Sequence, residues 1–239
     1  MGKIINGKLG QLKRNNTIIR EDIFKILERD SRTIYKPVSD DDICGFVYNY
    51  KKKKFTYINT YLPLEKQVFA AAHELYHVWF SDIKDGQPLY SEVLDGNIFS
   101  HKIKKEDFLA NRFAAEFLVQ EDVFRNEVNQ LLRGKSIIGI REIVELMDTF
   151  LVPYKTIIKR LYELIFINEK EYKDYMNPEN MDSVNSVSVW QERLKLCSRN
   201  NERTKILKLN DLVDISVELY EKRLIAYDKL GLTSAYAIC

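Results

Sequence analysis

Two of the three histidines in this 239-residue chain stand four residues apart, in the segment His73-Glu74-Leu75-Tyr76-His77. An α-helix places residues i and i+4 on one face, so both imidazoles can reach a single metal ion. Glu74 follows the first histidine and is placed to reach a water on that ion rather than the ion itself. The spacing therefore predicts a zinc site with His73 and His77 as ligands and Glu74 as general base.

The residues around this motif predict a buried helix over 65–81. The range is apolar on most sides, with Val68, Phe69 and Leu75 among its residues, and Pro63 suits the first turn of a helix. Histidine and glutamate are costly to bury in such a stretch unless they are paired or bind metal. A pair of hydrogen-bonded core histidines without metal is the alternative, and the pattern favours it less.

Two histidines do not complete a catalytic zinc site, which usually has three protein ligands and a water. The metzincin continuation requires glycine at position 80 and histidine at position 83, and Phe80 and Ile83 exclude that class. The third histidine, His101, falls in or near a predicted loop. The other candidates are carboxylates on the next long predicted helix, namely Glu106, Asp107 and Glu116.

The segment QVFAAAHELYH at 67–77 and the segment DFLANRFAAEFLV at 107–119 together resemble the ImmA/IrrE family of metallopeptidases. The range 67–77 is similar to the family's first metal-binding helix, and the range 107–119 is similar to its second. Tyr57-Ile58-Asn59 resembles the end of the preceding strand, and 150–161 resembles a later helix pair. The resemblance covers roughly residues 20–165.

This resemblance implies a gluzincin-like zinc metallo-endopeptidase. Asp107 stands where the family usually has a glutamate as third ligand, so His73, His77 and Asp107 are the implied ligand set, with Glu106 as the alternative to Asp107. Tyr76 stands at the family's glycine, and Gln120 stands at its proline.

Asn111 lies one turn after Asp107 on the same predicted helix face. It can hydrogen-bond a ligand and hold it in place, as groups behind a metal ligand do. A helix-surface asparagine is the equally weighted alternative.

The remaining patterns predict an α+β fold, in which a small antiparallel sheet packs on the metal-binding helices and the C-terminal part is helical. Ranges 45–50 and 55–61 predict a hairpin around four lysines, because they are rich in aromatic and β-branched residues. Helical periodicity is present over 18–27, 65–81, 105–119, 121–132, 140–150 and 154–167. The polar range 177–188 predicts a linker, and the chain from there to residue 226 predicts further helix.

We expect three parts along the chain. They are a zinc metallopeptidase core at 18–133, a helix-turn-helix-like pair packed on it at 137–168, and a helical extension at 169–239 whose role the sequence does not reveal.

Composition limits the partners of this chain. Its 37 basic and 35 acidic residues give a net charge of +2, which provides no global attraction to nucleic acid or anionic membrane. Three scattered cysteines without a CxxC argue against disulfides and a cysteine zinc site, and no apolar run is long enough to span a bilayer. We expect a cytoplasmic protein without membrane contact or direct nucleic-acid binding.

The expected activity is zinc-dependent hydrolysis of a peptide bond, in which Glu74 takes a proton from water and passes it to the leaving amine. Tyr76, Tyr90 and His101 are candidates for stabilising the oxyanion. Resemblance to zinc peptidases in general implies that the strand over 55–59 pairs with an extended substrate.

The family resemblance implies a helix-turn-helix transcriptional repressor as the protein substrate, which would make the chain an anti-repressor protease of a mobile element, phage or stress regulon. The alternative is a catalytically weak or inactive homologue that acts as a repressor-binding or DNA-associated regulatory module. A Glu74→Gln variant separates the two, because a protease loses its function on this change and a binding module keeps it.

Overall fold

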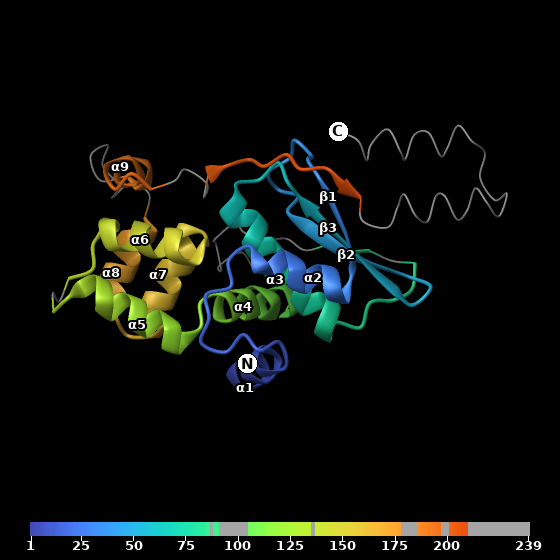
Figure 1. The fold of residues 1–239 in the computed structure, drawn as a ribbon, viewed down its shortest axis with the longest axis horizontal. Coiled ribbons are helices and arrows are strands. Elements are labelled where there is room, and N and C mark those ends of the chain that lie inside the picture. Colours follow the sequence, from blue (N-terminus) through green and yellow to red (C-terminus); the bar gives the residue numbers. More distant parts are fainter. Residues whose placement is uncertain (87, 91–104, 135–136, 178–185, 197–200, 210–239) are drawn as a thin grey trace.

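The computed structural model describes residues 1–86, 88–90, 105–134, 137–177, 186–196 and 201–209. Figure 1 shows the sheet and a group of C-terminal helices on opposite sides of α3 and α4. The elements within the described residues are α1 (Gly2–Gln11), α2 (Asp22–Asp30), β1 (Arg32–Lys36), β2 (Gly45–Tyr50), β3 (Lys53–Asn59), α3 (Leu64–Phe80), β4 (Pro88–Tyr90), α4 (Lys105–Leu118), α5 (Glu121–Leu132), α6 (Ile140–Phe150), α7 (Tyr154–Glu163), α8 (Glu169–Met176), α9 (Val187–Arg193) and β5 (Lys208–Leu209).

The described strands form one sheet in the order β4-β2-β3-β1-β5. The predicted hairpin is present as antiparallel β2 and β3, and β4 and β5 also pair in antiparallel fashion with their neighbours. β1 runs parallel to β3, in a register from Arg32 opposite Phe55 to Lys36 opposite Asn59. The α+β class is confirmed, and the sheet is mixed rather than antiparallel throughout.

The parallel pairing follows from the loop that joins β1 to β2. The buried side chain of Asn59, at the end of β3, donates hydrogen bonds to the carbonyls of Val38, Asp40 and Ile43 in this loop. The loop therefore crosses the end of β3 and delivers β1 and β2 to opposite edges of that strand. The spacing of apolar residues along the sequence gives no signal for a loop that crosses the end of β3.

β3 is an interior strand, because β1 and β2 occupy its two edges. Strand addition by a peptide requires an open edge with unpaired backbone groups. The predicted pairing of a substrate with residues 55–59 is therefore wrong.

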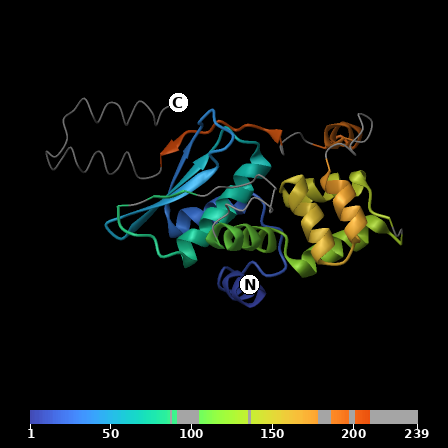
Figure 2. The same cartoon turned by 180° about the vertical axis from the view of Figure 1, so that it is seen from behind.

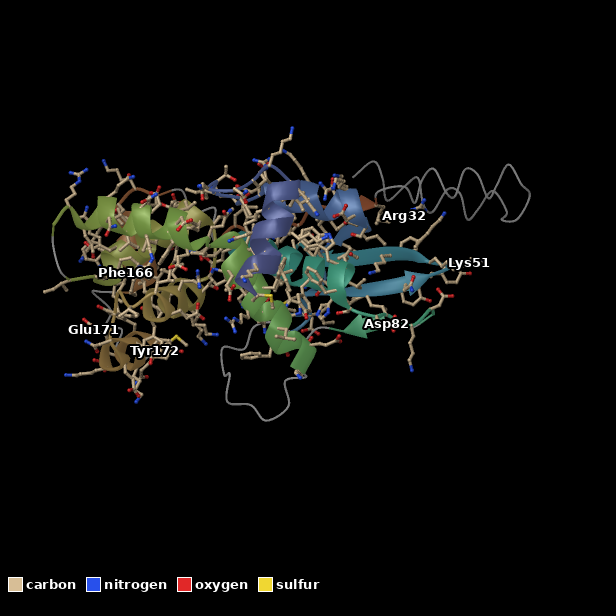
Figure 3. The ribbon with its side chains drawn as sticks, turned by 90° about the horizontal axis from the view of Figure 1, so that it is seen from below. Arg32, Lys51, Asp82, Phe166, Glu171 and Tyr172 are labelled. Carbon is tan, nitrogen blue, oxygen red and sulfur yellow. The ribbon has the colours of Figure 1, made fainter. Side chains whose placement is uncertain are left out.

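Helices α2 and α3 pack on the face of the sheet to which Val47 and Ile58 point, and both of these side chains are fully buried. Lys54, one of the four hairpin lysines, donates to the carbonyl of Val78 near the C-terminal end of α3, where carbonyls lack helical partners. Lys51 lies at the hairpin tip, far from Tyr172 of α8 and from Phe166, which lies between α7 and α8 (Figure 3). Lys51 and Lys52 therefore form the turn, and Lys53 and Lys54 begin β3, from which Lys54 also supports the end of α3.

Helix α4 packs on α3 through one apolar stripe. Its buried residues recur at the spacing of a helix face, namely Ala110, Phe113, Ala114, Phe117 and Leu118. Trp79 of α3 makes edge contacts with both phenylalanines, at 5.9 Å between ring centroids in each case. This packing fixes the rotation of α4 about its axis relative to α3.

The N-terminal helix α1, which the sequence patterns did not predict, packs on α4 with Ile5 and Leu9 buried. Gln120, the residue at the family's proline position, holds the segment that follows α1. Its side-chain amide donates to the carbonyls of Arg14 and Thr17 and accepts from the backbone of Asn16.

Helices α5, α6, α7 and α8 form a second group, which Figure 2 shows from behind. α5 and α6 have their predicted bounds, whereas α7 ends at Glu163, near which Ile165 adopts a left-handed conformation with φ of 63°. Beyond this group, β5 adds a strand beside β1.

The prediction of a helical C-terminal part is only partly correct, because α8 and α9 are helices but Lys208–Leu209 form strand β5. Residues 178–185, most of the predicted linker, and residues 210–226 of the expected helix lie outside the described residues. Across the described part of the chain, no helix combines the length and apolar character needed to cross a membrane.

Candidate metal centre

Three donor atoms converge between α3 and α4. The Nε2 atoms of His73 and His77 are 3.1 Å apart, and Oδ1 of Asp107 lies 3.8 Å from the first and 3.5 Å from the second. All three residues are buried, and their donor atoms lie within 4.8 Å of one another. A tetrahedral zinc ion with ligands at ~2.0–2.2 Å separates its donors by ~3.4 Å. The observed spacing fits such a site.

Two hydrogen bonds hold the far sides of the imidazoles. Nδ1 of His73 lies 2.8 Å from Oδ1 of Asn111, and Nδ1 of His77 lies 2.8 Å from Oγ of Ser81. When each Nδ1–H donates to its oxygen, each Nε2 presents a lone pair to the centre. Asn111 is thus beside the predicted ligand His73 rather than on an outer helix surface.

Burial keeps His73 neutral. It lowers the pKa of this imidazole to about 3, with a further decrease from neighbouring His77, while the hydrogen bond to Asn111 and the charge of Asp107 oppose the shift. A neutral imidazole is the form that binds metal. The electrostatic environment therefore favours a metal ligand over a histidinium ion.

Glu74 lies next to the centre without joining the group of three donors. The residue is fully buried, and its side chain approaches β2, where its Cγ and Oε1 lie 3.1 Å from the position of a Cβ built on Gly45. A glutamate beside the first histidine has the place that a general base requires in this motif.

The structure distinguishes among the candidates for the third metal ligand. Asp107 is 3% exposed and faces the histidines, whereas Glu106 is exposed and outside the cluster. Glu116 pairs with Arg112 at 2.7 Å. His101 lies outside the described residues.

Tyr76 packs beside the centre. Its ring meets that of His77 edge-on at 5.5 Å between centroids and also contacts Phe80 and Phe113. Burial, assisted by the charge of Glu106, raises the pKa of its phenol, so the hydroxyl keeps its proton at neutral pH. Tyr90 lies on β4, opposite Phe46 of β2.

Sequence reasoning missed Ser81 and the loop-holding role of Asn59. Ser81 follows His77 by four residues, so helical spacing was a usable signal for it. The role of Asn59 depends on a loop some twenty residues earlier in the chain, and local patterns carried no signal for it.

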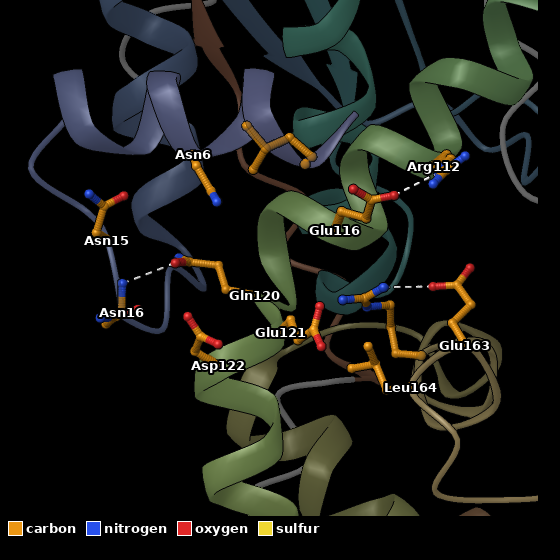
Figure 4. A pocket seen from close by; sticks show the side chains of 13 residues that line it. Asn6, Asn15, Asn16, Arg112, Glu116, Gln120, Glu121, Asp122, Glu163 and Leu164 are labelled. Carbon is orange, nitrogen blue, oxygen red and sulfur yellow. Dashed lines mark hydrogen bonds and ion pairs between the residues drawn. The ribbon is translucent and has the colours of Figure 1, made fainter.

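A cavity of about 730 Å³ opens where α1, the end of α4 and α7 meet (Figure 4). Two ion pairs line it, Arg112 with Glu116 and Arg160 with Glu163, and Gln120 lies between them in sequence. None of the three metal-donor residues contributes to its lining, so this cavity is separate from the centre.

Comparison with known families gives one match. Residues 28–162, more than half of the chain, match the family model Peptidase_M78, described as the IrrE N-terminal-like domain. A search of the curated proteins and of the solved structures returned no significant match. The matched range contains the metal-donor cluster and both helices that present it.

Proposed function

Because this chain belongs to the Peptidase_M78 family of IrrE N-terminal-like domains, we propose that it is a zinc-dependent endopeptidase. His73, His77 and Asp107 hold the metal in this proposal, and Glu74 is the general base. The family supports a metallopeptidase, and the buried cluster of three donors supports the ligand set.

The observation that carries the proposal is the convergence of three lone-pair donors. In the tautomers in which both Nδ1–H groups donate to Asn111 and Ser81, the two Nε2 lone pairs face each other and the Asp107 carboxylate. An added proton on His73 would relieve this repulsion, but burial and neighbouring His77 lower the pKa of that imidazole. A cation between the donors accepts all three lone pairs at once, whereas a hydrogen bond between the two Nε2 atoms joins only the histidines and leaves the Asp107 carboxylate out.

When bound, zinc supplies Lewis-acid chemistry that polarises the scissile carbonyl and lowers the pKa of water toward ~7. Glu74 accepts a proton from the attacking water and returns it to the leaving amine. Tyr76 is the oxyanion candidate whose side chain lies in the described part of the chain, and its protonated hydroxyl is a competent donor.

For the substrate, we propose a helix-turn-helix repressor. The support is the family resemblance of the two metal-binding helices, together with a peptidase family, which implies a protein substrate. In the same proposal, residues 18–133 are the peptidase core, and the helix pair within 137–168 packs on it through contacts between α7 and α4.

The first experiment is zinc analysis of the purified full chain, prepared without chelators. We expect about one zinc per wild-type chain and its loss in His77→Ala and Asp107→Ala. Glu106→Ala is the matched control, since this exposed neighbour of Asp107 should leave zinc unchanged. Little zinc in the wild type would contradict the proposal and favour a binding module.

A further inference from the structure

Gly45 begins β2 at the point where the sheet meets Glu74. It pairs with Ile58 of β3 and is buried. A Cβ built on it would lie 2.8 Å from the carbonyl oxygen of Tyr57 and 3.1 Å from both Cγ and Oε1 of Glu74. Gly45 is not among the described glycines with positive φ, so the requirement for glycine here is space and not backbone conformation.

Strand alternation explains why position 45 faces the base. Side chains two residues apart point to the same side of a strand, and Val47 is fully buried in the core. A side chain at position 45 would therefore enter the layer between β2 and α3. Glu74 already occupies that space from the α3 side.

The backbone at Gly45 is held firmly on both sides. The carbonyl of Cys44 accepts from the backbone N–H of Asn59 at 3.0 Å, and the carbonyl of Ile43 accepts from the Asn59 side chain at 2.8 Å. On its other side, β2 continues in the antiparallel ladder with β3. The strand is therefore a fixed surface that does not readily move away from Glu74.

We propose that Gly45 is a positioning residue for the general base. The bare backbone of β2 is the surface on which the Glu74 carboxylate rests, and the missing side chain sets how far that carboxylate extends beside the metal centre. A glutamate has several rotatable bonds, and catalytic groups must be held within ~0.5 Å of their productive position. The inference rests on the proposed function in one respect, the assignment of Glu74 as base.

The test is a cycle of Gly45→Ala, Glu74→Ala and the double variant in the full chain, with kcat measured for Gly45→Ala in its zinc-loaded form. Hydrolysis is followed with a quenched peptide library of mixed sequence, and melting temperature with the metal-free chain. The alanine at position 74 removes both Cγ and Oε1, the two Glu74 atoms nearest to position 45. Gly7→Ala is the matched control, because a Cβ there meets nothing within 4 Å.

We expect Gly45→Ala to lower kcat at least ~10-fold, since general-base catalysis contributes ~10²–10⁴-fold. Zinc content should stay the same, and KM should change less than about twofold. In the Glu74→Ala background, which lacks the base, the same alanine at position 45 should lower the melting temperature less than it does in the wild type. Gly7→Ala should leave kcat and KM as in the wild type and should not lower the melting temperature, because alanine is favoured over glycine inside helix α1.

Equal effects of Gly45→Ala on the melting temperature in both backgrounds would overturn the inference, because the alanine would then act through the Tyr57 carbonyl alone. If Gly45→Ala does not fold, the Glu74→Ala background decides: restored folding supports the contact, and continued misfolding overturns it. A wild type that binds no zinc or cleaves no peptide contradicts the proposed function instead, and the melting cycle still reports whether Gly45 holds Glu74.

Discussion

The helix pair α3–α4 and the helix pair α6–α7 are both well packed, but they bury different kinds of side chain. The first pair buries His73, Glu74, His77 and Asp107, each at most 3% exposed. The second pair buries mainly aliphatic and aromatic residues, among them Ile143, Met147, Phe150, Ile157, Ile158 and Leu161.

This difference in buried side chains predicts that α3–α4 carries the chemistry and that α6–α7 contributes mainly to stability. Burying ionisable groups opposes folding unless a partner or a metal compensates, whereas burying apolar surface favours folding. Substitutions at the centre should therefore remove activity or metal while the fold persists. Substitutions in α6–α7 should remove stability while the chemistry of the folded molecules persists.

The α6–α7 pair also carries little free positive charge. Arg160 is buried and pairs with Glu163 at 2.6 Å, which leaves Lys155 and Lys159 as the basic residues of α7 with more exposed surface. A recognition helix for DNA presents basic side chains outward. The packing therefore fits a structural role for this pair.

The sharpest test of the comparison is Glu74→Gln. We expect peptide hydrolysis to fall ~10²–10⁴-fold, because the amide cannot accept the proton, with zinc content unchanged. Melting temperature should be unchanged or higher, since a buried carboxylate is removed. Glu106→Gln, on the exposed surface of α4, is the control. Retained hydrolysis in Glu74→Gln would refute the assigned base.

Phe150→Ala tests the other region. Its ring is 1% exposed and contacts Phe124 at 5.5 Å between centroids, so we expect a loss of ~3–5 kcal/mol in unfolding free energy. Zinc per folded chain should not change. Urea unfolding measures the loss, and Ile137→Ala, at a 74% exposed site, should change stability by less than ~0.5 kcal/mol. Loss of zinc from folded Phe150→Ala would show that the packing of α6–α7 also affects the metal centre.

Removing the side chains that hydrogen-bond the Nδ1 atoms of the two histidines should have a smaller effect on zinc binding than removing a ligand. We expect Asn111→Ala and Ser81→Ala each to weaken zinc binding ~10–100-fold, because each removes the hydrogen bond that orients an imidazole. Competition with a zinc chelator measures the affinity. Asn126→Ala, on the exposed surface of α5, is the control. Unchanged affinity in both variants would show that packing alone orients the rings.

The last prediction concerns the pH dependence of stability in the metal-free chain. The pKa of folded His73 is lowered to about 3, against 6.5 for the ordinary imidazole, so the unfolded chain binds a proton that the folded chain excludes. Stability is complete above pH ~6.5 and falls at up to ~1.4 kcal/mol per unit as pH decreases toward 3.

Melting of chelator-treated protein between pH 5 and 7 measures this slope. Phe150→Ala should keep it, and His73→Gln should lose it. The lowered pKa values of Asp22 and Asp30 affect stability only at lower pH, below the ordinary aspartate value of 3.8. A slope that persists in His73→Gln would assign the effect to another group.

Local patterns were most reliable where one period repeats over several turns. The apolar stripe of α4 and the bounds of α5 and α6 follow from helical spacing, and the hairpin follows from its aromatic strands. The patterns failed for α1, whose buried residues are only Ile5 and Leu9. They also failed for the partner of β1, because strand pairing depends on the path of a loop.

The sequence by itself determined that His73 and His77 share a helix face and that Glu74 adjoins them, because four residues nearly complete one helical turn. Only the tertiary structure decided that Asp107 completes the cluster and Glu106 does not. Neighbouring residues on a helix point ~100° apart, and the packing of Phe113 and Phe117 on Trp79 sets which of them faces α3. The approach of Gly45 to Glu74 was likewise decided by a strand and a helix that meet only in the folded chain.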